Sequence, residues 1–368
     1  MKKRLLLIVT AIALILSLAA CGGGSSSSKG PAPTTKKSYS FTIGSGHSPA
    51  GFPYVSAAQD FFEPEVIAKA AELGYEVTFT EAYGGTIAPL ADMFEATASG
   101  QLDIGVANSL FEPTKAMLLN YNAYCPFGID DVATSYEIGT RVYEANKETI
   151  DKMLAQYDIK YLGVGIPISS YNLLTQFPVE SIADLKGHKI AAAGANLYLL
   201  NGIGATGVES NLNEAYTSLQ TGVYEGWIVW PNGVNGYKMD EVAEYYTKTG
   251  FGNSNTCHLL FNMDTWNSLP EDLQNVFLDA AVGDYKTKGL ERAASEDAAA
   301  YEAMESHGTI VTEMSEEART EWIMAIEDPA VAAIEEMEKA GLPAAKVFSD
   351  FYTISEELGY TSPRRFGQ

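Results

Sequence analysis

Short apolar strands alternate with helices from residue 39 onward, and this alternation limits the possible folds more than any other feature. Residues 39–43 alternate in polarity and predict a strand, and residues 75–80 and 102–106 predict two more. Helices are expected between them, over residues 61–74 and 90–99. The order strand–helix–strand implies a parallel sheet with crossover helices. Ligands bind such sheets at the carboxyl ends of the strands, where the loops gather.

The same pattern begins again after a helical region over residues 134–156. The later elements are predicted strands at 159–164, 173–175, 189–191 and 226–229, and a predicted helix at 213–222. A further strand at 259–263 is expected to cross back to the first half of the chain. These elements predict two similar α/β halves.

A long helix is expected to follow the last strand. Ser268 and Glu271 have the spacing of a capping box, and helix-forming residues continue from Leu269 to about Ser306. At ~1.5 Å per residue, an unbroken helix of this length would reach ~55 Å. It could then lie across both halves.

The N-terminus has the pattern of a bacterial lipoprotein signal. Basic residues 2–4 precede an apolar stretch at 5–18, which is too short to span a bilayer comfortably. Leu18-Ala19-Ala20-Cys21 forms a lipobox, so we expect residues 1–20 to be a signal peptide and Cys21 to carry the lipid. Residues 21–38 are rich in Gly, Ser and Pro and are expected to be a flexible tether. The protein would be extracytoplasmic and lipid-anchored to the cell membrane, on its periplasmic face or at the cell surface.

The remaining 39–368 are too long for one typical hydrophobic core and suggest two domains. We place 39–165 plus 257–295 in domain I, and 166–256 plus 296–368 in domain II. The fold class is therefore α/β, with two domains of the periplasmic-binding-protein type, crossing strands and a long domain-spanning helix.

The chain is strongly acidic. A cleaved signal would remove three of the 24 basic residues, which leaves 21 against 47 acidic residues and a net charge of −26. Such a charge argues against nucleic acid or an anionic membrane surface as a partner. Two cysteines remain after lipidation, Cys125 and Cys257, and their spacing leaves both a disulfide and free thiols open.

No recognisable catalytic motif is present. The sequence has no Gly-x-Ser-x-Gly elbow, P-loop or His-Glu-x-x-His pattern, and its four histidines are isolated from one another. We therefore expect no metal, no cofactor and no enzyme activity. The competing interpretation, an exported enzyme on the same scaffold, would require a nucleophile or a metal site in the cleft.

Three stretches resemble the solute-binding proteins of TRAP transporters, of the dicarboxylate-binding DctP type: 184–190, 204–206 and 214–226. Weaker similarities occur at His47, at 100–104 and at 266–274. The resemblance implies two α/β domains that close over one small organic solute. It also implies delivery of the solute to a membrane permease with a small and a large subunit. An ABC-type or sensor-coupled binding protein is the alternative; a neighbouring ATPase gene would favour the ABC type.

The chain departs from that family pattern where the substrate carboxylate is usually bound. Ala191 stands where the family usually has an arginine, Asn172 aligns with a second frequent arginine, and Trp227 replaces a small or polar residue. A buried carboxylate without its partner costs roughly 3–5 kcal/mol. We therefore hypothesise a neutral or weakly polar solute, aromatic or polyhydroxylated, that stacks on Trp227 or Trp230. Its hydrogen bonds would come from the amides of Asn172, Asn196 and Asn232.

Five other residues are candidates by position. His47, Gly84 and Asn108 lie at the ends of predicted strands, Tyr171 lies beside Asn172 on an inter-strand turn, and Phe127 echoes a Pro-Phe segment of the family. Each of these residues also has a purely structural interpretation, and Trp227 and Trp230 could equally belong to the core. The full set of predicted ligand-binding residues is His47, Gly84, Asn108, Phe127, Tyr171, Asn172, Asn196, Trp227, Trp230 and Asn232.

Overall fold

A computed structural model describes residues 37–253 and 255–368. The predicted signal peptide, Cys21 and most of the predicted tether lie outside these residues. Within the described part of the chain, none of the helices has the length and apolar character needed to cross a bilayer.

The first of two sheets contains five strands. In spatial order they are β2 (Tyr75–Ala82), β1 (Lys37–Gly44), β3 (Ile104–Asn108), β10 (Cys257–Asn262) and β4 (Ile159–Val164). Strand β1 begins two residues earlier than expected. It pairs in parallel with β2 along its whole length, and every residue of β3 and β10 is buried.

The second sheet contains six strands. Their order is β11 (Ile310–Glu313), β9 (Tyr245–Lys248), β5 (Asn172–Thr175), β8 (Gly226–Val229), β6 (Lys189–Ala192) and β7 (Thr206–Glu209). The described chain thus has two separate sheets, as expected from the restart of the strand pattern.

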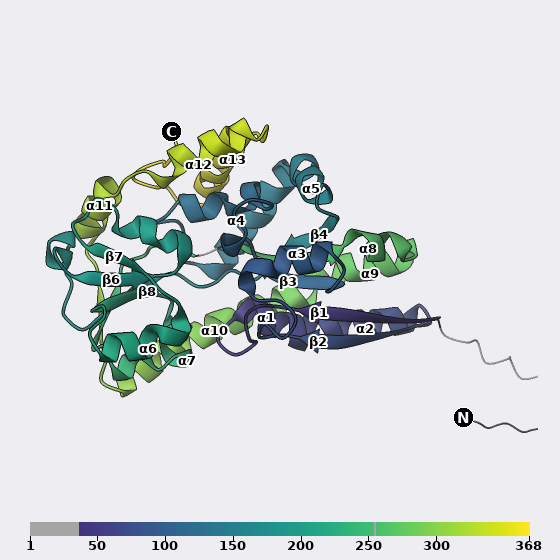
Figure 1. The fold of residues 1–368 in the computed structure, drawn as a ribbon, viewed down its shortest axis with the longest axis horizontal. Coiled ribbons are helices and arrows are strands. Elements are labelled where there is room, and N and C mark those ends of the chain that lie inside the picture. Colours follow the sequence, from purple (N-terminus) through teal and green to yellow (C-terminus); the bar gives the residue numbers. More distant parts are fainter. Residues whose placement is uncertain (1–36, 254) are drawn as a thin grey trace, which may run out of the picture. The chain divides into compact units, whose positions relative to one another are not determined.

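Helices surround both sheets (Figure 1). The α-helices of the first half are α1 (Pro53–Ala57), α2 (Glu63–Glu72), α3 (Met93–Ala98), α4 (Val132–Ala145) and α5 (Lys147–Ala155). The middle of the chain contributes α6 (Leu212–Gln220), α7 (Pro231–Gly236) and α8 (Met263–Ser268). The last five are α9 (Glu271–Val282), α10 (Asp284–Ser306), α11 (Glu316–Ala325), α12 (Pro329–Lys339) and α13 (Ala344–Glu357).

Both sheets are mixed, whereas the sequence pattern predicted parallel ones. Strand β10 runs antiparallel to β3 and β4, and β5 runs antiparallel to β8 and β9. Both exceptions follow a segment in which the chain crosses from one sheet to the other. A strand that enters a sheet in this way approaches it from the opposite direction, so the crossing explains the reversed strands.

The two crossing segments are hydrogen-bonded to each other. The backbone N–H of Gly165 donates to Cys257 O at 2.7 Å. Tyr171 and the segment at Phe251 and Gly252 then exchange two bonds: Tyr171 N to Gly252 O and Phe251 N to Tyr171 O, each 3.1 Å. The segments therefore form one short ladder between the sheets, which suits a hinge.

The predicted single long helix is in fact two helices. The break lies at Gly283, whose φ of −85° and ψ of −122° are not helical. Glu65 occupies the adjacent space and accepts a hydrogen bond from Asp284 N at 2.6 Å, which satisfies a free donor at the start of α10. A Cβ at 283 would clash with Oε1 of Glu65, so a larger residue there would displace the Glu65 carboxylate. The run of helix-forming residues on both sides of Gly283 gave no indication of this break in the sequence.

Helix α10 nevertheless contacts both halves. It packs on α1 and α4 of the first half and on α7 and β11 of the second. Helix α13 packs on α4 although it ends the chain. The exact domain boundaries remain a prediction.

Replacement of Gly139 by alanine should destabilise the fold. Gly139 lies in α4, and a Cβ there would meet the amide of buried Asn255, with Cγ at 2.8 Å. That amide donates to Ser135 O at 2.7 Å and has little room to move. We expect a loss of about 2–3 kcal/mol in urea unfolding, although alanine favours helices. Gly163→Ala is the control, because its Cβ would meet Ala281 at an ordinary 3.8 Å. Equal stability of the two variants would contradict this prediction.

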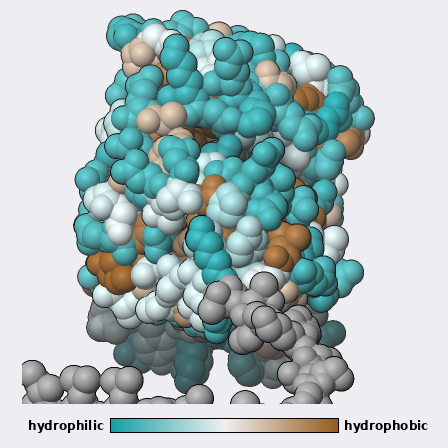
Figure 2. All heavy atoms as spheres, turned by 90° about the vertical axis from the view of Figure 1, so that its right-hand side faces the viewer, coloured by the Kyte–Doolittle hydropathy of each residue, from teal (hydrophilic) through white to brown (hydrophobic). Residues whose placement is uncertain are grey.

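Hydrophilic side chains predominate on the face of the molecule shown in Figure 2, and apolar side chains form small, separate patches there. The apolar surface is thus scattered on this face, as is usual for folded proteins.

Candidate functional site

An aromatic cavity lies where both sheets present the carboxyl ends of their strands. We call it the aromatic cavity; it is lined by His47, Phe52, Asn108, Leu110, Phe111, Ile168, Tyr171, Ala193, Asn196, Leu212, Trp227, Ile228 and Trp230. Its first residues follow β1 and β3, its last follow or belong to β6 and β8, and Ile168 and Tyr171 come from a crossing segment. The cavity measures about 40 Å³. This volume holds one or two water molecules, so a larger solute requires the halves to separate.

Aromatic rings from the two halves meet in this cavity. Phe52 contacts Trp230 with ring centroids 5.3 Å apart, and Tyr171 meets Trp230 edge-on at 5.5 Å. His47 stacks flat on Phe52 at 3.6 Å. The rings offer a large, rigid apolar surface with edges and faces suited to a planar solute.

His47 contributes no positive charge. Burial lowers the pKa of His47 to about 3, and its Nδ1 shares a 2.7 Å hydrogen bond with the hydroxyl of Tyr54. Neither lysine nor arginine occurs among the described residues that line the aromatic cavity. The cavity is therefore uncharged at neutral pH.

Ala191 and Trp227 are neighbours in the second sheet. Ala191 of β6 and Trp227 of β8 are register partners in parallel strands, so their side chains lie on the same face of the sheet. Both are buried, with exposed fractions of 0% and 1%. A large buried ring at 227 therefore has a small side chain as its neighbour on the adjacent strand.

Three polar side chains in the aromatic cavity differ in their availability. Trp230 is buried, and its Nε1–H has no partner among the described residues. The Oδ1 of Asn108 is already occupied by Leu110 N at 3.0 Å and Thr256 Oγ1 at 2.8 Å. Asn196 lies beside the Tyr171 hydroxyl and hydrogen-bonds to it. The indole N–H is thus the clearest free donor for a solute.

Four predicted residues lie elsewhere. The Asn172 amide is used by the backbone, since Oδ1 accepts from Thr249 N at 2.9 Å and Gly250 N at 3.1 Å. Asn232 donates to Glu296, and Phe127 packs on Phe251 in the core. Gly84 is exposed and only supports the first loop, through a bond from its N–H to His47 O at 2.9 Å.

Several lining residues were not among the predicted ones: Phe52, Leu110, Phe111, Ile168, Ala193, Leu212 and Ile228. Phe52, Leu110 and Phe111 follow the ends of β1 and β3, where ligand-binding loops are expected. Their position after these strands could therefore have identified them as candidate site residues from the sequence.

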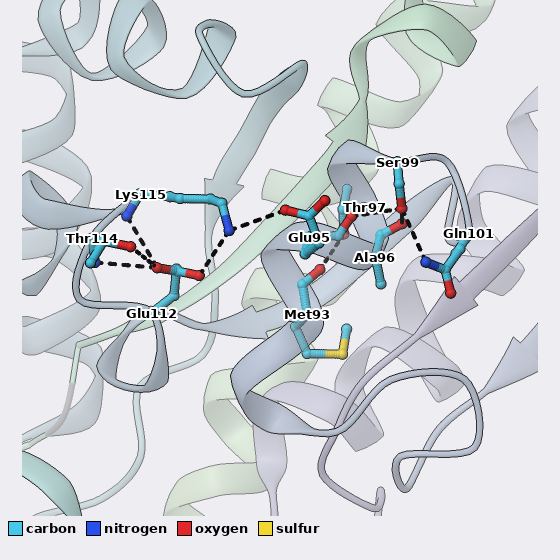
Figure 3. Close-up of polar contacts among 9 residues, drawn as sticks. All are labelled: Met93, Glu95, Ala96, Thr97, Ser99, Gln101, Glu112, Thr114 and Lys115. Carbon is cyan, nitrogen blue, oxygen red and sulfur yellow. Dashed lines mark hydrogen bonds and ion pairs between the residues drawn. The ribbon is translucent and has the colours of Figure 1, made fainter.

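A polar network holds the loop that carries Leu110 and Phe111 (Figure 3). Oε1 of Glu112 accepts from Thr114 Oγ1 at 2.6 Å and from Lys115 N at 3.2 Å. Lys115 Nζ bridges Glu112 at 3.3 Å and Glu95 of α3 at 3.2 Å. Burial alone would raise the pKa of Glu112, but these hydrogen bonds and the Lys115 charge outweigh it and lower the pKa. The loop is thereby fixed to the first half.

Glu63 should make stability fall as the pH rises. Glu63 is 5% exposed and accepts a hydrogen bond from Tyr83, which precedes the Gly84 loop. Burial raises the pKa of Glu63 to about 7, and the charges of Glu81 and Asp60 add to the effect. A carboxyl group whose pKa is raised by folding stabilises the protein most at low pH, and this contribution is lost between its unfolded pKa and about 7.

We expect Glu63→Gln, measured against the wild type by urea unfolding across this range, to remove about 3 kcal/mol of that pH dependence. Glu76→Gln, at an exposed carboxylate on β2, is the control. Identical pH profiles for the wild type and Glu63→Gln would refute the assignment.

Ser109 and His258, in the described part of the chain, form a serine–histidine pair, but it is enclosed. Ser109 Oγ lies 3.0 Å from His258 Nε2, and the hydroxyl of Tyr161 lies 3.0 Å from His258 Nδ1. Ser109 and His258 are buried, and burial lowers the pKa of His258 to about 3. A base with so low a pKa is poorly suited to activate a hydroxyl. The network instead joins β3, β4 and β10.

The thiols of Cys125 and Cys257 are free and buried. The described residues contain no group of three or more His, Cys, Asp and Glu side chains with metal-binding geometry.

Comparison with known proteins identifies clear relatives. The profile of bacterial extracellular solute-binding protein, family 7 (DctP), matches residues 61–336. A solute-binding protein of Sulfitobacter sp. is 36% identical over 136 residues, which cover 35% of this chain and 39% of the relative. This match thus spans well under half of the relative's length.

Solved structures show the same fold. A TRAP periplasmic solute-binding protein from Desulfovibrio salexigens aligns with a TM-score of 0.75 and 20% identity, covering 89% of this chain and 99% of the other. A marine metagenome TRAP solute-binding protein specific for aromatic acid ligands, in complex with metahydroxyphenylacetate, aligns with a TM-score of 0.71 and 17% identity. The alignment covers 87% of this chain and 99% of that one. At these identities the likeness establishes the fold alone.

Proposed function

We propose that this chain, which belongs to the bacterial extracellular solute-binding proteins of family 7, captures a small uncharged solute with an aromatic or similarly flat ring in the aromatic cavity. The protein would close over the solute and deliver it to a TRAP-type permease with a small and a large membrane subunit. The observation that carries the proposal is a cavity built of stacked rings without a cation. Family membership and the hinge-like crossing segments support the transport role.

The class of solute is the feature in which we expect this chain to differ from its relatives. The metagenome relative is specific for aromatic acids, and an acid needs a partner for its carboxylate. In this chain uncharged Ala191 is the register neighbour of Trp227, and the Asn172 amide oxygen accepts hydrogen bonds from two backbone N–H groups. The ring-binding part of such a site is therefore present without a carboxylate clamp, which favours a neutral ring.

Calorimetry with a panel of solutes tests this proposal. The panel contains succinate, a sialic acid, neutral aromatic compounds and neutral sugars. We expect measurable binding among the neutral ring compounds and none with succinate. Tight binding of succinate would overturn the proposed solute class.

A receptor role without catalysis is part of the proposal. The enclosed Ser109–His258 pair supports it, because neither residue lines any of the described cavities. A solute recovered unchanged after prolonged incubation with the protein is the expected result. Turnover of a bound panel compound would contradict it.

We also propose that Cys21 carries a lipid and that residues after it tether the receptor to the membrane. The lipobox at residues 18–21 supports this proposal. A single acyl chain binds membranes weakly, so stable attachment needs the two or three chains of a lipoprotein. Cys21→Ser should move nearly all of the protein from the membrane fraction to the soluble fraction, measured by immunoblotting. Cys125→Ser is the control, and an unchanged membrane fraction for Cys21→Ser would contradict the anchor.

A further inference from the structure

A second, smaller chamber continues the aromatic cavity. The two share Leu110, Tyr171 and Asn196, and the chamber measures about 30 Å³. Among its other lining residues are Asn122, Phe251, Gly252 and Asn253. We call it the amide chamber because three asparagines line it and none of its described lining residues is charged.

The side chain of Asn253 has no partner in this chamber. Asn253 is 5% exposed, and neither Nδ2 nor Oδ1 makes a hydrogen bond to the described part of the protein. Its backbone is nevertheless fixed, because its N–H donates to Ile129 O at 3.1 Å. A buried amide with both polar atoms unpaired destabilises a protein, and such groups are rare unless something else pairs with them.

Two neighbouring acceptors already take part in other hydrogen bonds. Asn122 Oδ1 already accepts from Asn255 N at 2.8 Å, and Gly252 O accepts from Tyr171 N at 3.1 Å. The chamber has room for about one water molecule. A solute group that reached the chamber from the aromatic cavity would take the place of that water beside Tyr171 and Asn196, which line both.

We infer that the amide chamber binds an uncharged donor–acceptor edge of the solute, such as a carboxamide or lactam. This inference rests on the proposed function and specifies its solute class. Asn253 Nδ2 donates to the solute carbonyl oxygen, and Asn253 Oδ1 accepts from the solute N–H. The ring of the same solute lies against Phe52 and Trp230. A carboxylate would present two acceptors to this amide and leave Oδ1 without a donor.

Two uncharged probes separate the chamber from the aromatic cavity. Phenylacetamide carries a ring and an amide edge, whereas phenethyl alcohol carries the ring and only a hydroxyl group. In Asn253→Leu, which keeps the volume of the side chain, we expect phenylacetamide to bind about 10-fold or more weakly by calorimetry. Phenethyl alcohol should bind this variant within about threefold of the wild type.

The matched control is Asn120→Leu. Asn120 is 3% exposed and its Oδ1 is also unpaired, but it does not line the amide chamber. This variant should bind both probes as the wild type does. The melting temperature of Asn253→Leu should not fall, because leucine removes two unpaired polar atoms. A large fall with unchanged phenylacetamide affinity would show a structural role and overturn the inference.

A measurement on the unmodified protein covers the case in which Asn253→Leu fails to fold. Phenylacetone keeps the ring and the carbonyl oxygen of phenylacetamide but has no N–H. We expect it to bind at least about 10-fold more weakly than phenylacetamide. Equal affinities would overturn the amide chamber while the proposed function stands, provided that phenethyl alcohol binds. Failure of every uncharged ring compound to bind would overturn both.

Discussion

Phenylacetate is expected to bind the aromatic cavity about 100-fold or more weakly than phenethyl alcohol at neutral pH, although the two are nearly the same size. A buried carboxylate without a partner costs roughly 3–5 kcal/mol, and each 1.4 kcal/mol is a factor of ten in affinity. The described lining residues of the cavity include no lysine or arginine, and His47 is uncharged. Calorimetry on the wild-type protein measures both affinities.

The pH dependence makes this test sharper. Only the protonated, uncharged acid should bind. As the pH falls from neutrality, the apparent affinity for phenylacetate should therefore rise about tenfold per pH unit until the pH reaches the pKa of the acid. His47 stays neutral over that range because its pKa is about 3. Phenethyl alcohol serves as the control, and its affinity should stay constant. Tight binding of phenylacetate at neutral pH would show that a cation reaches the cavity.

The strands that could be predicted are those that bury apolar side chains. Strands β3 and β10 are fully buried, and both appear in the sequence as short apolar runs. Three strands were missed: every residue of the edge strands β7 and β11 is exposed or only partly buried, and the short interior strand β9 buries only Tyr246 and Thr247. An edge strand that buries little leaves no hydrophobic period to detect. Its position is decided by pairing with β6 or β9 instead.

Residues of the candidate site could be predicted where their type was unusual for the position. Trp227 stood out as a large ring where the family pattern suggests a small or polar residue, and Trp230 as a second ring three residues later; both line the aromatic cavity. Asn172 stood out in the same way but lies outside it, because Thr249 and Gly250 bind its amide. Those partners are more than 70 residues away in sequence. Nothing local to Asn172 indicates them.

Asn253 shows the opposite limit of sequence reasoning. Asparagine is common in loops and turns, so its type attracts no attention. Asn253 is a candidate because its side-chain amide is buried without a hydrogen-bond partner among the described residues, and this depends on how the crossing segments pack around it. Such a property exists only in three dimensions.

Trp230→Ala should abolish most solute binding, with an affinity loss of about 100-fold for phenethyl alcohol. Trp230 contacts Phe52 of the first half at 5.3 Å and Tyr171 of a crossing segment at 5.5 Å, so its ring forms a wall of the cavity. Buried aromatic residues of this kind dominate binding energies, at about 2–4 kcal/mol each. Tryptophan fluorescence and calorimetry measure the loss.

Two further variants separate the contributions of Trp230. Trp230→Phe keeps an aromatic ring but removes the unpaired Nε1–H, so a loss of about tenfold would identify that N–H as a donor to the solute. Trp266→Ala is the matched control, because Trp266 is 7% exposed and packs on Phe261 away from the cavity. It should lower the melting temperature but leave the affinity unchanged. If Trp266→Ala weakened binding as much as Trp230→Ala, the loss would reflect general destabilisation, and Trp230 would have no specific role in the site.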